Sequence, residues 1–398
     1  MTKQLQDAYI VAATRTPIGK APRGMFRNVR PDDLLVRVLQ SVLAQAPGLD
    51  PKLIEDVIVG CAFPEAEQGL NVARMAVLLA GLPNTIGGVT VNRYCASGIT
   101  AIAMAADRIR VGQADVMIAA GVESMSMVPM MGHHPSMNMN IFKDENITMA
   151  YGMGLTAERV AEQWKVSREA QDEFALKSHQ KAIAAQQAGE FKDETTSVEI
   201  VERTPNLLTR EIDVRTRIVS QDEGARADSS LASLGKLKPV FAAKGSVTAG
   251  NSSQTSDGAG ALLLVSEKIL KQFNLTPLAR FASFAVRGVP PGIMGIGPSA
   301  AVPLACQAAG ISKEQIDWFE LNEAFAAQSL AVLQDLALDP AKVNPLGGAI
   351  ALGHPLGATG AIRAATVIHG LRRRNLKYGM VTMCVGTGMG AAGIFERV

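Results

Sequence analysis

Short apolar runs alternate with amphipathic stretches over the first third of the chain. Runs rich in β-branched residues predict three strands, at residues 8–13, 56–60 and 115–121. Between them the apolar positions recur at helical spacing, which predicts helices over residues 34–46 and 98–111. Strands that alternate with helices in this way indicate an α/β fold of mostly parallel sheets covered by helices.

The last third of the chain repeats this plan. Its helices are expected at residues 300–309, from 323 and at 358–371, and its strands at 278–286 and 316–321, with a closing pair around 380–395. In both thirds a glycine-rich turn opens a helix of small residues that leads into a methionine-containing strand. We interpret the chain as two similar halves, each of which supplies one cysteine to a shared centre.

The middle of the chain, about residues 123–246, departs from the plan and is interpreted as an insertion over the core. A strongly helical segment, residues 167–189, begins at Ser167, which is placed to cap it. A polar strand-and-loop region follows.

Flexible methionines suit either contact with a variable apolar ligand or the filling of irregular gaps. Nearly half of the chain's methionines precede the helix: Met125, Met127, Met130, Met131, Met137, Met139, Met149 and Met153.

The composition limits the possible functions. A chain of 398 residues that is 47% hydrophobic can bury a sizeable core, and its length suggests two or three domains. The formal charge of +2 implies no general polyanion partner. A basic run at residues 372–374 falls at an expected helix end, where cations are favourable, so nucleic-acid binding is not expected.

The cysteine pattern and the two ends of the chain bear on location. Four cysteines in a chain of this length form no disulfide framework, so a reducing compartment is expected. The adjacent His133 and His134 are poorly spaced for one metal, and no metal site is expected. Residues 1–7 are too polar for a signal peptide, no apolar run is long enough to span a membrane, and residues 396–398 are not a peroxisomal address. The simplest location is the cytoplasm.

Cys95 stands just ahead of an expected helix of small residues. A thiol at a helix N-terminus faces unpaired N–H groups and the positive end of the helix dipole, and both stabilise a thiolate. The small residues that follow, such as Ser97 and Gly98, leave room for a substrate to approach. A buried structural cysteine is the competing interpretation.

Three further positions could supply the remaining chemistry. His354 lies in a glycine-dense loop, residues 347–360, and is the only side chain there that exchanges protons near pH 7. Cys384 ends a predicted strand and enters a glycine-containing turn whose N–H groups suit an oxyanion. Asn322 is either a helix N-cap or an amide that holds a water or an oxyanion. Two thiols, a base and an amide together indicate a site that makes and breaks thioesters.

Four motifs, in this order, resemble the thiolase family and specifically its degradative 3-ketoacyl-CoA thiolases: Cys95-Ala96-Ser97, Asn322-Glu323-Ala324-Phe325, Gly353-His354-Pro355 and Cys384-Val385-Gly386. The likeness runs essentially from end to end. It implies a thiolase fold of five layers, α-β-α-β-α, with two similar halves and an inserted loop domain over the coenzyme A site. The expected boundaries are 1–122 with 247–275 for the N-terminal half, 123–246 for the loop domain and 276–398 for the C-terminal half.

The resemblance also implies roles for the site residues. Cys95 resembles the nucleophile that becomes acylated, and His354 resembles the base that activates it. Cys384 matches the thiol that carries a proton to and from C2 of acetyl-CoA or the CoA sulfur. Asn322 matches the residue whose bound water, with His354, receives the enolate oxygen. The backbone N–H groups of Cys95 and Gly386 match a second oxyanion hole.

Five more residues match the family's contacts with its substrate. Arg226 and Ser253 fall where the family contacts CoA, and Met153, Ala324 and Phe325 fall where it lines the pantetheine channel. CoA and acyl-CoA are then substrates, and no metal or redox cofactor is expected. The resemblance further implies a homodimer or homotetramer and leaves a partner in a β-oxidation complex open.

Two departures from the family pattern bear on the reaction. Gly152 stands where short-chain biosynthetic thiolases often have histidine, and Thr387 stands where glycine is frequent. The first favours thiolytic cleavage of 3-ketoacyl-CoA in fatty-acid β-oxidation over an acetoacetyl-CoA thiolase that runs the Claisen condensation. Cys384 argues against a β-ketoacyl synthase-like condensing enzyme. A cysteine hydrolase and a non-catalytic lipid-binding relative are the competing functions from different classes. Acyl chain length is left open.

Overall fold

The computed structural model describes residues 5–398, so the first four residues of the polar N-terminal segment lie outside it. The large sheet contains two sets of four neighbouring strands, which we call the N-terminal and the C-terminal run. The two runs have the same strand order along the chain and the same parallel and antiparallel pairings. In each run the first two strands pair in parallel and the next two pairings are antiparallel. The N-terminal run is β3 (Asp56–Gly60), β5 (Val116–Ser124), β8 (Ser256–Ser266) and β1 (Ala8–Arg15). The C-terminal run is β10 (Trp318–Leu321), β11 (Tyr378–Val385), β12 (Met389–Glu396) and β9 (Ala279–Gly288).

The two runs join at one place, where β1 pairs with β9 through Tyr9 and Ile10. This pairing makes a continuous 10-stranded sheet. β4 (Val89–Val91) forms its edge next to β3, and β2 (Gly19–Lys20) pairs with β8. The repeated strand order confirms the prediction of two similar halves.

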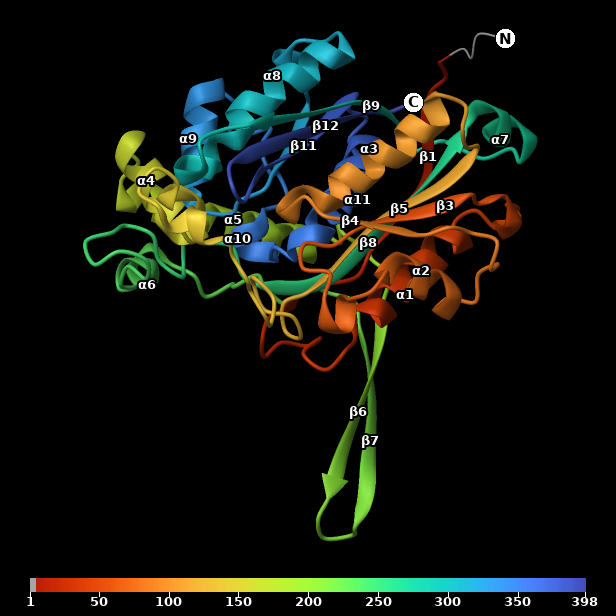
Figure 1. The fold of residues 1–398 in the computed structure, drawn as a ribbon, viewed down its shortest axis with the longest axis horizontal. Helices are drawn as coiled ribbons and strands as arrows, with labels where there is room; N and C mark the ends of the chain where they lie inside the picture. Colours follow the sequence, from red (N-terminus) through yellow and green to blue (C-terminus); the bar gives the residue numbers. More distant parts are fainter. Residues whose placement is uncertain (1–4) are drawn as a thin grey trace.

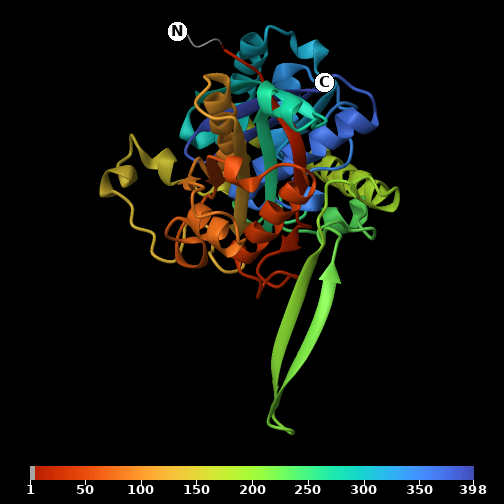
Figure 2. The same ribbon diagram turned by 90° about the vertical axis from the view of Figure 1, so that its right-hand side faces the viewer.

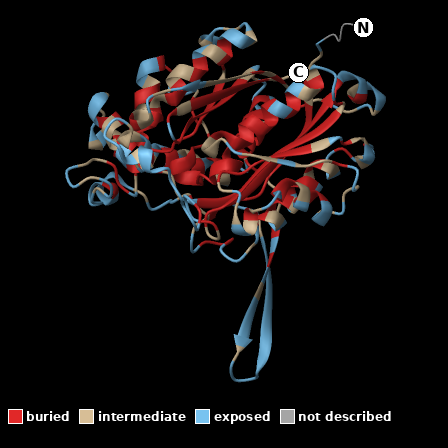
Figure 3. Ribbon diagram, in the orientation of Figure 1, coloured by how far each residue is buried: buried red, intermediate tan, exposed pale blue. Residues whose placement is uncertain are grey.

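Helices cover both runs and also fill the space between them (Figure 1). Buried side chains form three large cores: one lies under the outer helices of each run, and the third surrounds the central helices and fills both gaps between them and the two runs. Figure 3 shows the central helices and strands as the most buried parts. The predicted five layers are therefore present. The outer helices on the N-terminal run are α1 (Pro31–Ala44) and α2 (Val72–Leu79), the central pair is α3 (Ser97–Arg110) and α11 (Leu356–Arg373), and the outer helices on the C-terminal run are α8 (Gly297–Ala309) and α9 (Ala326–Leu336).

The segment Pro291–Ala309 has the length and composition of a membrane span, but 50% of it is buried within the fold. It consists of a short 3-10 helix and α8, and α8 packs against β9 and β12. Ala301, Val302 and Ala305 lie in the core there. We interpret the segment as a core helix of the outer layer.

Glycines let the two central helices touch backbone to backbone. A Cβ atom on Gly98 would lie 2.8 Å from the Ala361 nitrogen and 2.8 Å from the Gly357 oxygen. A Cβ atom on Gly360 would overlap the backbone of Ile99. Because no side chain fits between them, α3 and α11 cross at their first turns, and the residues just ahead of each helix are brought together.

The segment between β5 and β8 carries the elements that do not belong to the repeated plan. A hairpin of β6 (Val198–Asn206) and β7 (Glu211–Val219) stands out from the body (Figures 1 and 2). Leu207 and Leu208 at its tip are 90% and 96% exposed. The loop-domain boundaries expected from the sequence stay predictions. The elements are η4 (Met139–Phe142), η5 (Ile147–Ala150), α4 (Met153–Gln163), α5 (Arg168–Gln187), β6 (Val198–Asn206), β7 (Glu211–Val219) and α6 (Leu231–Gly235).

The remaining elements are short connections: η1 (Pro51–Leu53), η2 (Ala66–Gln68), η3 (Tyr94–Ala96), α7 (Glu267–Gln272), η6 (Pro291–Ile296), η7 (Lys313–Gln315) and α10 (Ala349–Leu352). The predicted strands and helices of the two halves are present within a few residues, with one shift that matters. The helix expected from residue 323 begins only at Ala326, so Asn322 is not its N-cap. Ser167 does cap α5, accepting a hydrogen bond from the Ala170 N–H at 3.2 Å.

We expect Gly360→Ala to lower the free energy of unfolding by about 3 kcal/mol, because a methyl group there overlaps backbone that cannot move aside. Urea denaturation followed by circular dichroism measures the change. Gly235→Ala is the matched control, since Gly235 is also helical and a Cβ atom there meets nothing within 4 Å. Equal stability of the two variants would contradict the close crossing of α3 and α11.

Candidate active site

Cys95 lies in a tight turn that leads into α3. The turn is held by Ser97, whose hydroxyl donates to the Tyr94 carbonyl at 2.7 Å and accepts from the Arg93 N–H at 2.8 Å. Tyr94 has a positive φ of 43°. Two backbone N–H groups, those of Gly386 and of Cys95 itself, face the Cys95 sulfur. The structure thus brings together the two N–H groups expected to form an oxyanion hole.

Burial dominates the protonation of Cys95. It raises the pKa of the thiol to about 11, and the two N–H groups lower the pKa only in part. The N–H groups at the start of the helix favour the thiolate, as expected from the sequence, but the desolvation of the sulfur outweighs them. Cys95 is a thiol at neutral pH and needs a base when it reacts.

His354 is placed by a glycine turn and held by its neighbours. Gly353 has a positive φ of 100°, which favours glycine, and the His354 N–H donates to the Gln254 carbonyl at 3.1 Å. The ring Nδ1 lies 2.7 Å from the Thr359 hydroxyl, and Nε2 lies 3.3 Å from the Asn322 amide nitrogen. Since the Asn322 nitrogen can only donate, Nε2 accepts and Nδ1 carries the proton.

The imidazole of His354 is neutral at physiological pH. Burial, and to a lesser extent the positive charge of Arg363, together lower its pKa to about 3. A neutral ring with its lone pair on Nε2 has the form of a general base. His354 therefore has the protonation state that its predicted role needs.

Asn322 follows β10 and is fixed by its backbone, whose N–H donates to the Thr382 carbonyl at 2.9 Å. Its side-chain nitrogen faces His354, while its Oδ1 is buried without a hydrogen-bond partner among residues 5–398. Buried polar atoms rarely stay without a partner. Of the two interpretations from the sequence, the amide that holds a ligand atom fits and the helix N-cap does not.

Cys384 ends β11 in a fully buried position. Burial raises the pKa of its thiol, and the charge on Cys95 adds to the rise. Met153 connects the two cysteines, because it packs with Cys384 and lines the same cavity as Cys95. The turn that follows contains Thr387 with φ 65° and Gly388 with φ 87°. A threonine in this left-handed region costs on the order of 1 kcal/mol, which explains why glycine suits position 387.

Glu123 was not singled out from the sequence, and it ties the site together. Its buried carboxylate accepts hydrogen bonds from the backbone N–H groups of Ala62 and Gly357, both at 2.8 Å, and from Phe63 at 3.3 Å. The Gln68 side chain also donates to it. Glu123 thus links the ends of β3 and β5 to the first turn of α11, next to His354. The feature of the sequence that could have identified Glu123 is an acidic residue at the end of an otherwise apolar strand.

Two cavities flank these residues. One, of about 320 Å³, is lined by Cys95, Gly386 and Met153. The other, of about 660 Å³, is lined by both predicted CoA contacts, Arg226 and Ser253. Ala324 and Phe325 pack with Cys384 and Met153, and the Phe325 ring meets the Phe241 ring, which lines the larger cavity. Of the predicted substrate contacts, Met153 thus lies at the cavity of Cys95, Arg226 and Ser253 lie at the larger cavity, and Ala324 and Phe325 pack between Cys384 and that larger cavity.

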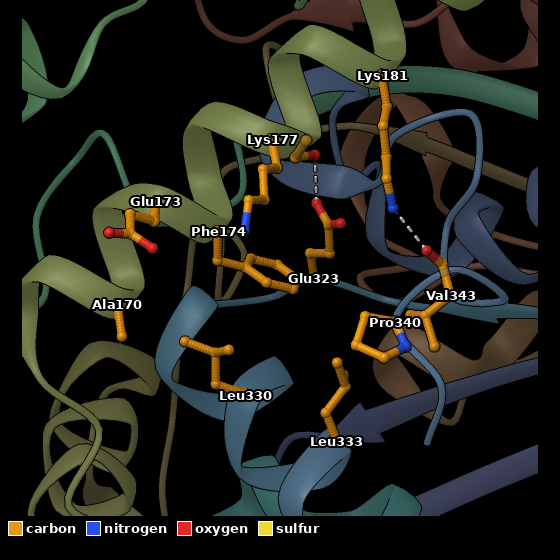
Figure 4. A pocket seen from close by; sticks show the side chains of 11 residues that line it. Ala170, Glu173, Phe174, Lys177, Lys181, Glu323, Leu330, Leu333, Pro340 and Val343 are labelled. Atoms are coloured by element: carbon orange, nitrogen blue, oxygen red, sulfur yellow. Dashed lines mark hydrogen bonds between the residues drawn. The ribbon is translucent and has the colours of Figure 1, made fainter. Parts of the chain in front are cut away.

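A third cavity, of about 210 Å³, lies between α5 and α9 and contains none of the predicted site residues (Figure 4). The Glu323 side chain faces it and is held by the Ser178 hydroxyl at 2.7 Å, by the Asn344 amide at 2.8 Å and by the Ile350 N–H at 3.2 Å. Glu323 thus points away from the two thiols. It fixes the backbone next to Asn322 and the loop before His354.

The comparisons with known proteins agree with this geometry. The family model of the thiolase N-terminal domain matches residues 8–268, and that of the C-terminal domain matches residues 275–397. The chain belongs to the thiolase family. A 3-ketoacyl-CoA thiolase of Bacillus subtilis is 49% identical over 98% of this chain and 100% of its own.

Two solved thiolase structures superpose on nearly the whole chain. The Bacillus anthracis acetyl-CoA acetyltransferase has a TM-score of 0.90 at 38% identity and covers 100% of both chains. The human mitochondrial 3-ketoacyl-CoA thiolase in complex with CoA has a TM-score of 0.87 at 37% identity and covers 99% of this chain and 98% of its own. The fold predicted from the sequence is confirmed.

We expect the buried neutral His354 to make this thiolase less stable in acid. The unfolded imidazole takes up a proton near pH 6.5, whereas the folded one does so only near pH 3. Unfolding therefore binds a proton between these values, and the folded state loses stability as the pH falls from 6.5. At pH 5 the loss from this residue is about 2 kcal/mol.

The test is urea denaturation of the wild type and of His354→Asn at pH 7.5 and pH 5. The variant should lose about 2 kcal/mol less between the two pH values, because asparagine does not titrate. All other titrating groups are shared, so they cancel in the comparison. Parallel losses would mean that the imidazole is protonated in the folded protein.

Proposed function

We propose that this thiolase cleaves 3-ketoacyl-CoA with CoA to give acetyl-CoA and an acyl-CoA shortened by two carbons, as in fatty-acid β-oxidation. The observation that carries the proposal is that both thiols and the imidazole lie around one cavity. Cys95 packs with Leu356, two residues after His354, and Met153 packs with Cys384 and lines the cavity together with Cys95. The 3-ketoacyl-CoA thiolase names of similar proteins support the direction of the reaction.

The first half-reaction forms an acyl-enzyme. His354 Nε2 takes the proton of Cys95 as the sulfur attacks C3 of the substrate, and the oxygen on C3 becomes an oxyanion held by the N–H groups of Cys95 and Gly386. The C2–C3 bond then breaks. The acyl group stays on Cys95, and the enolate of acetyl-CoA, next to Asn322 and His354, takes a proton at C2 from Cys384.

The second half-reaction returns the enzyme to its first state. A new CoA loses its thiol proton to the Cys384 thiolate, and the CoA sulfur attacks the acyl group on Cys95. The same N–H groups receive the oxyanion. Cys95 leaves as a thiolate and regains its proton from His354. Donors aimed at a developing oxyanion commonly supply about 10²–10³ in rate each, so the turn at Gly386 matters as much as the side chains.

CoA is assigned to the larger cavity as a substrate. Its lining includes two cationic side chains, Lys20 and Arg226, and one acidic side chain, Asp228, so that positive charge prevails and suits phosphate groups; the hydroxyl of Ser253 also lines it. The Ser253 N–H donates to the Ala324 carbonyl at 2.9 Å, which connects this cavity to the residues around Cys384. The reaction as proposed moves only protons and acyl groups, so it needs no metal or redox cofactor.

The biosynthetic direction is the second candidate, because the Bacillus anthracis acetyl-CoA acetyltransferase has the same fold. Both reactions use the same residues and differ in the acyl group and the working direction. A β-ketoacyl synthase is not favoured, since the buried Cys384 beside Cys95 has no role in it. A cysteine hydrolase is not favoured for the same reason.

We expect Cys95→Ser to abolish the acyl-enzyme that the wild type forms with acetyl-CoA, because the hydroxyl is a far weaker nucleophile. Intact-protein mass spectrometry detects the adduct.

Cys384→Ser should keep the adduct but slow the exchange of acetyl-CoA C2 protons at least about 100-fold, as measured by NMR. Cys306→Ser, at a remote cysteine of the outer layer, is the control. An adduct on another residue, or unchanged exchange, would refute these roles.

A homodimer or homotetramer is proposed for the assembly. The edge strand β4 has an unpaired side and Val89 is exposed there, and α2 beside it exposes Met75, Leu78 and Leu79. Sheet edges and apolar patches of this kind favour pairing with another chain.

The four cysteines are free, which suits the cytoplasmic location that stays a prediction. A partner in a β-oxidation complex also stays a prediction.

We expect Met75→Glu with Leu79→Glu to lower the molar mass in light scattering from a multiple of 42.0 kDa to that of the single chain, because two carboxylates oppose burial of this patch. The control places the same two glutamates at Leu207 and Leu208 on the hairpin tip, which should leave the mass unchanged. If only the hairpin pair lowered the mass, the interface would lie at the hairpin instead. A single-chain mass for the wild type would contradict the proposal.

A further inference from the structure

Glu323 is a buried carboxylate that the proposed reaction does not use. Its three hydrogen-bond partners all donate, which is the pattern of an ionised carboxylate. They come from three separate segments: Ser178 from α5, Asn344 from the loop after α9, and Ile350 from α10. Glu323 therefore fastens three segments to the residue that follows Asn322.

Two of these segments lead directly to the catalytic centre. The Asn344 side chain also bonds to both backbone groups of Leu321, accepting from its N–H at 2.9 Å and donating to its carbonyl at 2.8 Å. Ile350 lies in the short helix α10, which ends just ahead of His354. The 3.3 Å contact between Asn322 Nδ2 and His354 Nε2 thus lies between two segments that one carboxylate joins.

The third segment, α5, also contacts the larger cavity to which CoA is assigned. His179, next to Ser178, lines that cavity, and its Nδ1 accepts a hydrogen bond from the Arg226 N–H at 3.2 Å. Neighbouring residues of one helix therefore contact the proposed CoA site and the Glu323 carboxylate. Glu323 is linked to α5 at the point where this helix meets the CoA cavity.

Hydrogen bonds, more than packing, hold the Glu323 carboxylate. A Cβ atom on Gly348 would lie 2.1 Å from its carboxyl carbon, so only glycine fits on that side. On another side Glu323 faces the cavity of about 210 Å³ between α5 and α9 (Figure 4). Lys181 lines the same cavity but donates to the Val343 carbonyl at 2.9 Å, and Glu323 forms no ion pair among residues 5–398. A side chain that borders a cavity has room to move when one of its hydrogen bonds is lost.

The Asn322 side chain has few contacts of its own. Its Nδ2 faces His354, and its Oδ1 has no hydrogen-bond partner among residues 5–398. Its orientation therefore follows from its backbone, which is fixed by the Thr382 carbonyl and by the neighbouring Glu323. We propose that Glu323 is a positioning residue, which orients Asn322 for the enolate of acetyl-CoA without contacting the substrate. This inference rests on the thiolase reaction proposed above and adds the residue that controls one of its steps.

Glu323→Gln separates this role from the filling of space. The amide has the same shape, but only one of its two ends accepts hydrogen bonds. If its oxygen faces Ser178 and Ile350, its NH₂ group meets the NH₂ group of Asn344. If its oxygen faces Asn344, its NH₂ group meets the Ile350 N–H. Two donors oppose each other in either orientation, so the segments are pushed apart.

We expect Glu323→Gln to slow the enolate step selectively. Exchange of acetyl-CoA C2 protons, measured by NMR, should slow at least about tenfold, because a shift of about 1 Å in a catalytic group costs up to about 100-fold. The acyl-enzyme on Cys95 should form at the wild-type rate, because His354 keeps its bonds to Gln254 and Thr359. Exchange at the wild-type rate, or an equal loss in both steps, would overturn the proposal.

A double-mutant cycle tests whether Glu323 acts through Asn322. On the residual exchange of Asn322→Ala, the further change Glu323→Gln should have no effect, because the amide that it positions is absent. If the two effects multiply instead, Glu323 acts on the site by another route, and the proposal is overturned.

Ser178→Ala changes the same carboxylate from outside the catalytic motifs. It should slow C2 exchange less than Glu323→Gln does, since two of the three donors remain. Ser283→Ala is the matched control, because its buried hydroxyl donates to the Ala305 carbonyl at the same 2.7 Å but lies in the outer layer of the C-terminal run. It should exchange at the wild-type rate. Equal rates for the two serine variants would contradict the link between α5 and Glu323.

Acyl transfer distinguishes a failure of this inference from a failure of the proposed function. Mass spectrometry of each protein mixed with acetyl-CoA reports the adduct on Cys95. If the wild type forms no adduct, the thiolase reaction itself fails. If all variants form the adduct and Glu323→Gln exchanges C2 protons like the wild type, only the role of Glu323 fails.

Discussion

The backbone contact between α3 and α11 is the constraint on which the site depends. Gly98 and Gly360 remove the side chains that would hold the two helices apart, so the first turns of the helices meet. Cys95 lies just ahead of one helix and His354 just ahead of the other. A larger separation of the helices would move the thiol away from its base. The buried site is thus a consequence of helix packing rather than of the loops that carry the motifs.

The repeated strand order explains why these residues meet. α3 leads to β5 in one half and α11 leads to β11 in the other, so Cys95 and His354 take corresponding places ahead of the two central helices. Glu123 and Cys384 also correspond, because each lies at the end of the strand that follows. One half uses this place for a carboxylate that fixes three backbone N–H groups, and the other uses it for a second thiol.

Much of the fold could be predicted because apolar periodicity and glycine-rich turns mark most elements of the two halves. β8 was not recognised as a strand, since it is buried on both faces and shows no alternation of apolar and polar residues. A shared centre with one cysteine from each half was expected from the repeated pattern, and the roles of Cys95, His354 and Cys384 in it from the resemblance. Glu123 was missed because a single acidic residue carries no motif. The pKa of Cys95 could not be predicted, because the sequence shows the helix end but not the depth of burial.

That burial also determines how the site controls its reactivity. At rest both thiols and the imidazole are uncharged, because desolvation raises the pKa of Cys95 and Cys384 and lowers that of His354. An ion pair between thiolate and imidazolium is therefore unfavourable until a substrate oxygen takes up negative charge next to the N–H groups of Cys95 and Gly386. In the proposed reaction the proton leaves Cys95 only as the bond to carbon forms, so the high pKa of the thiol keeps the nucleophile protonated until a substrate is in place.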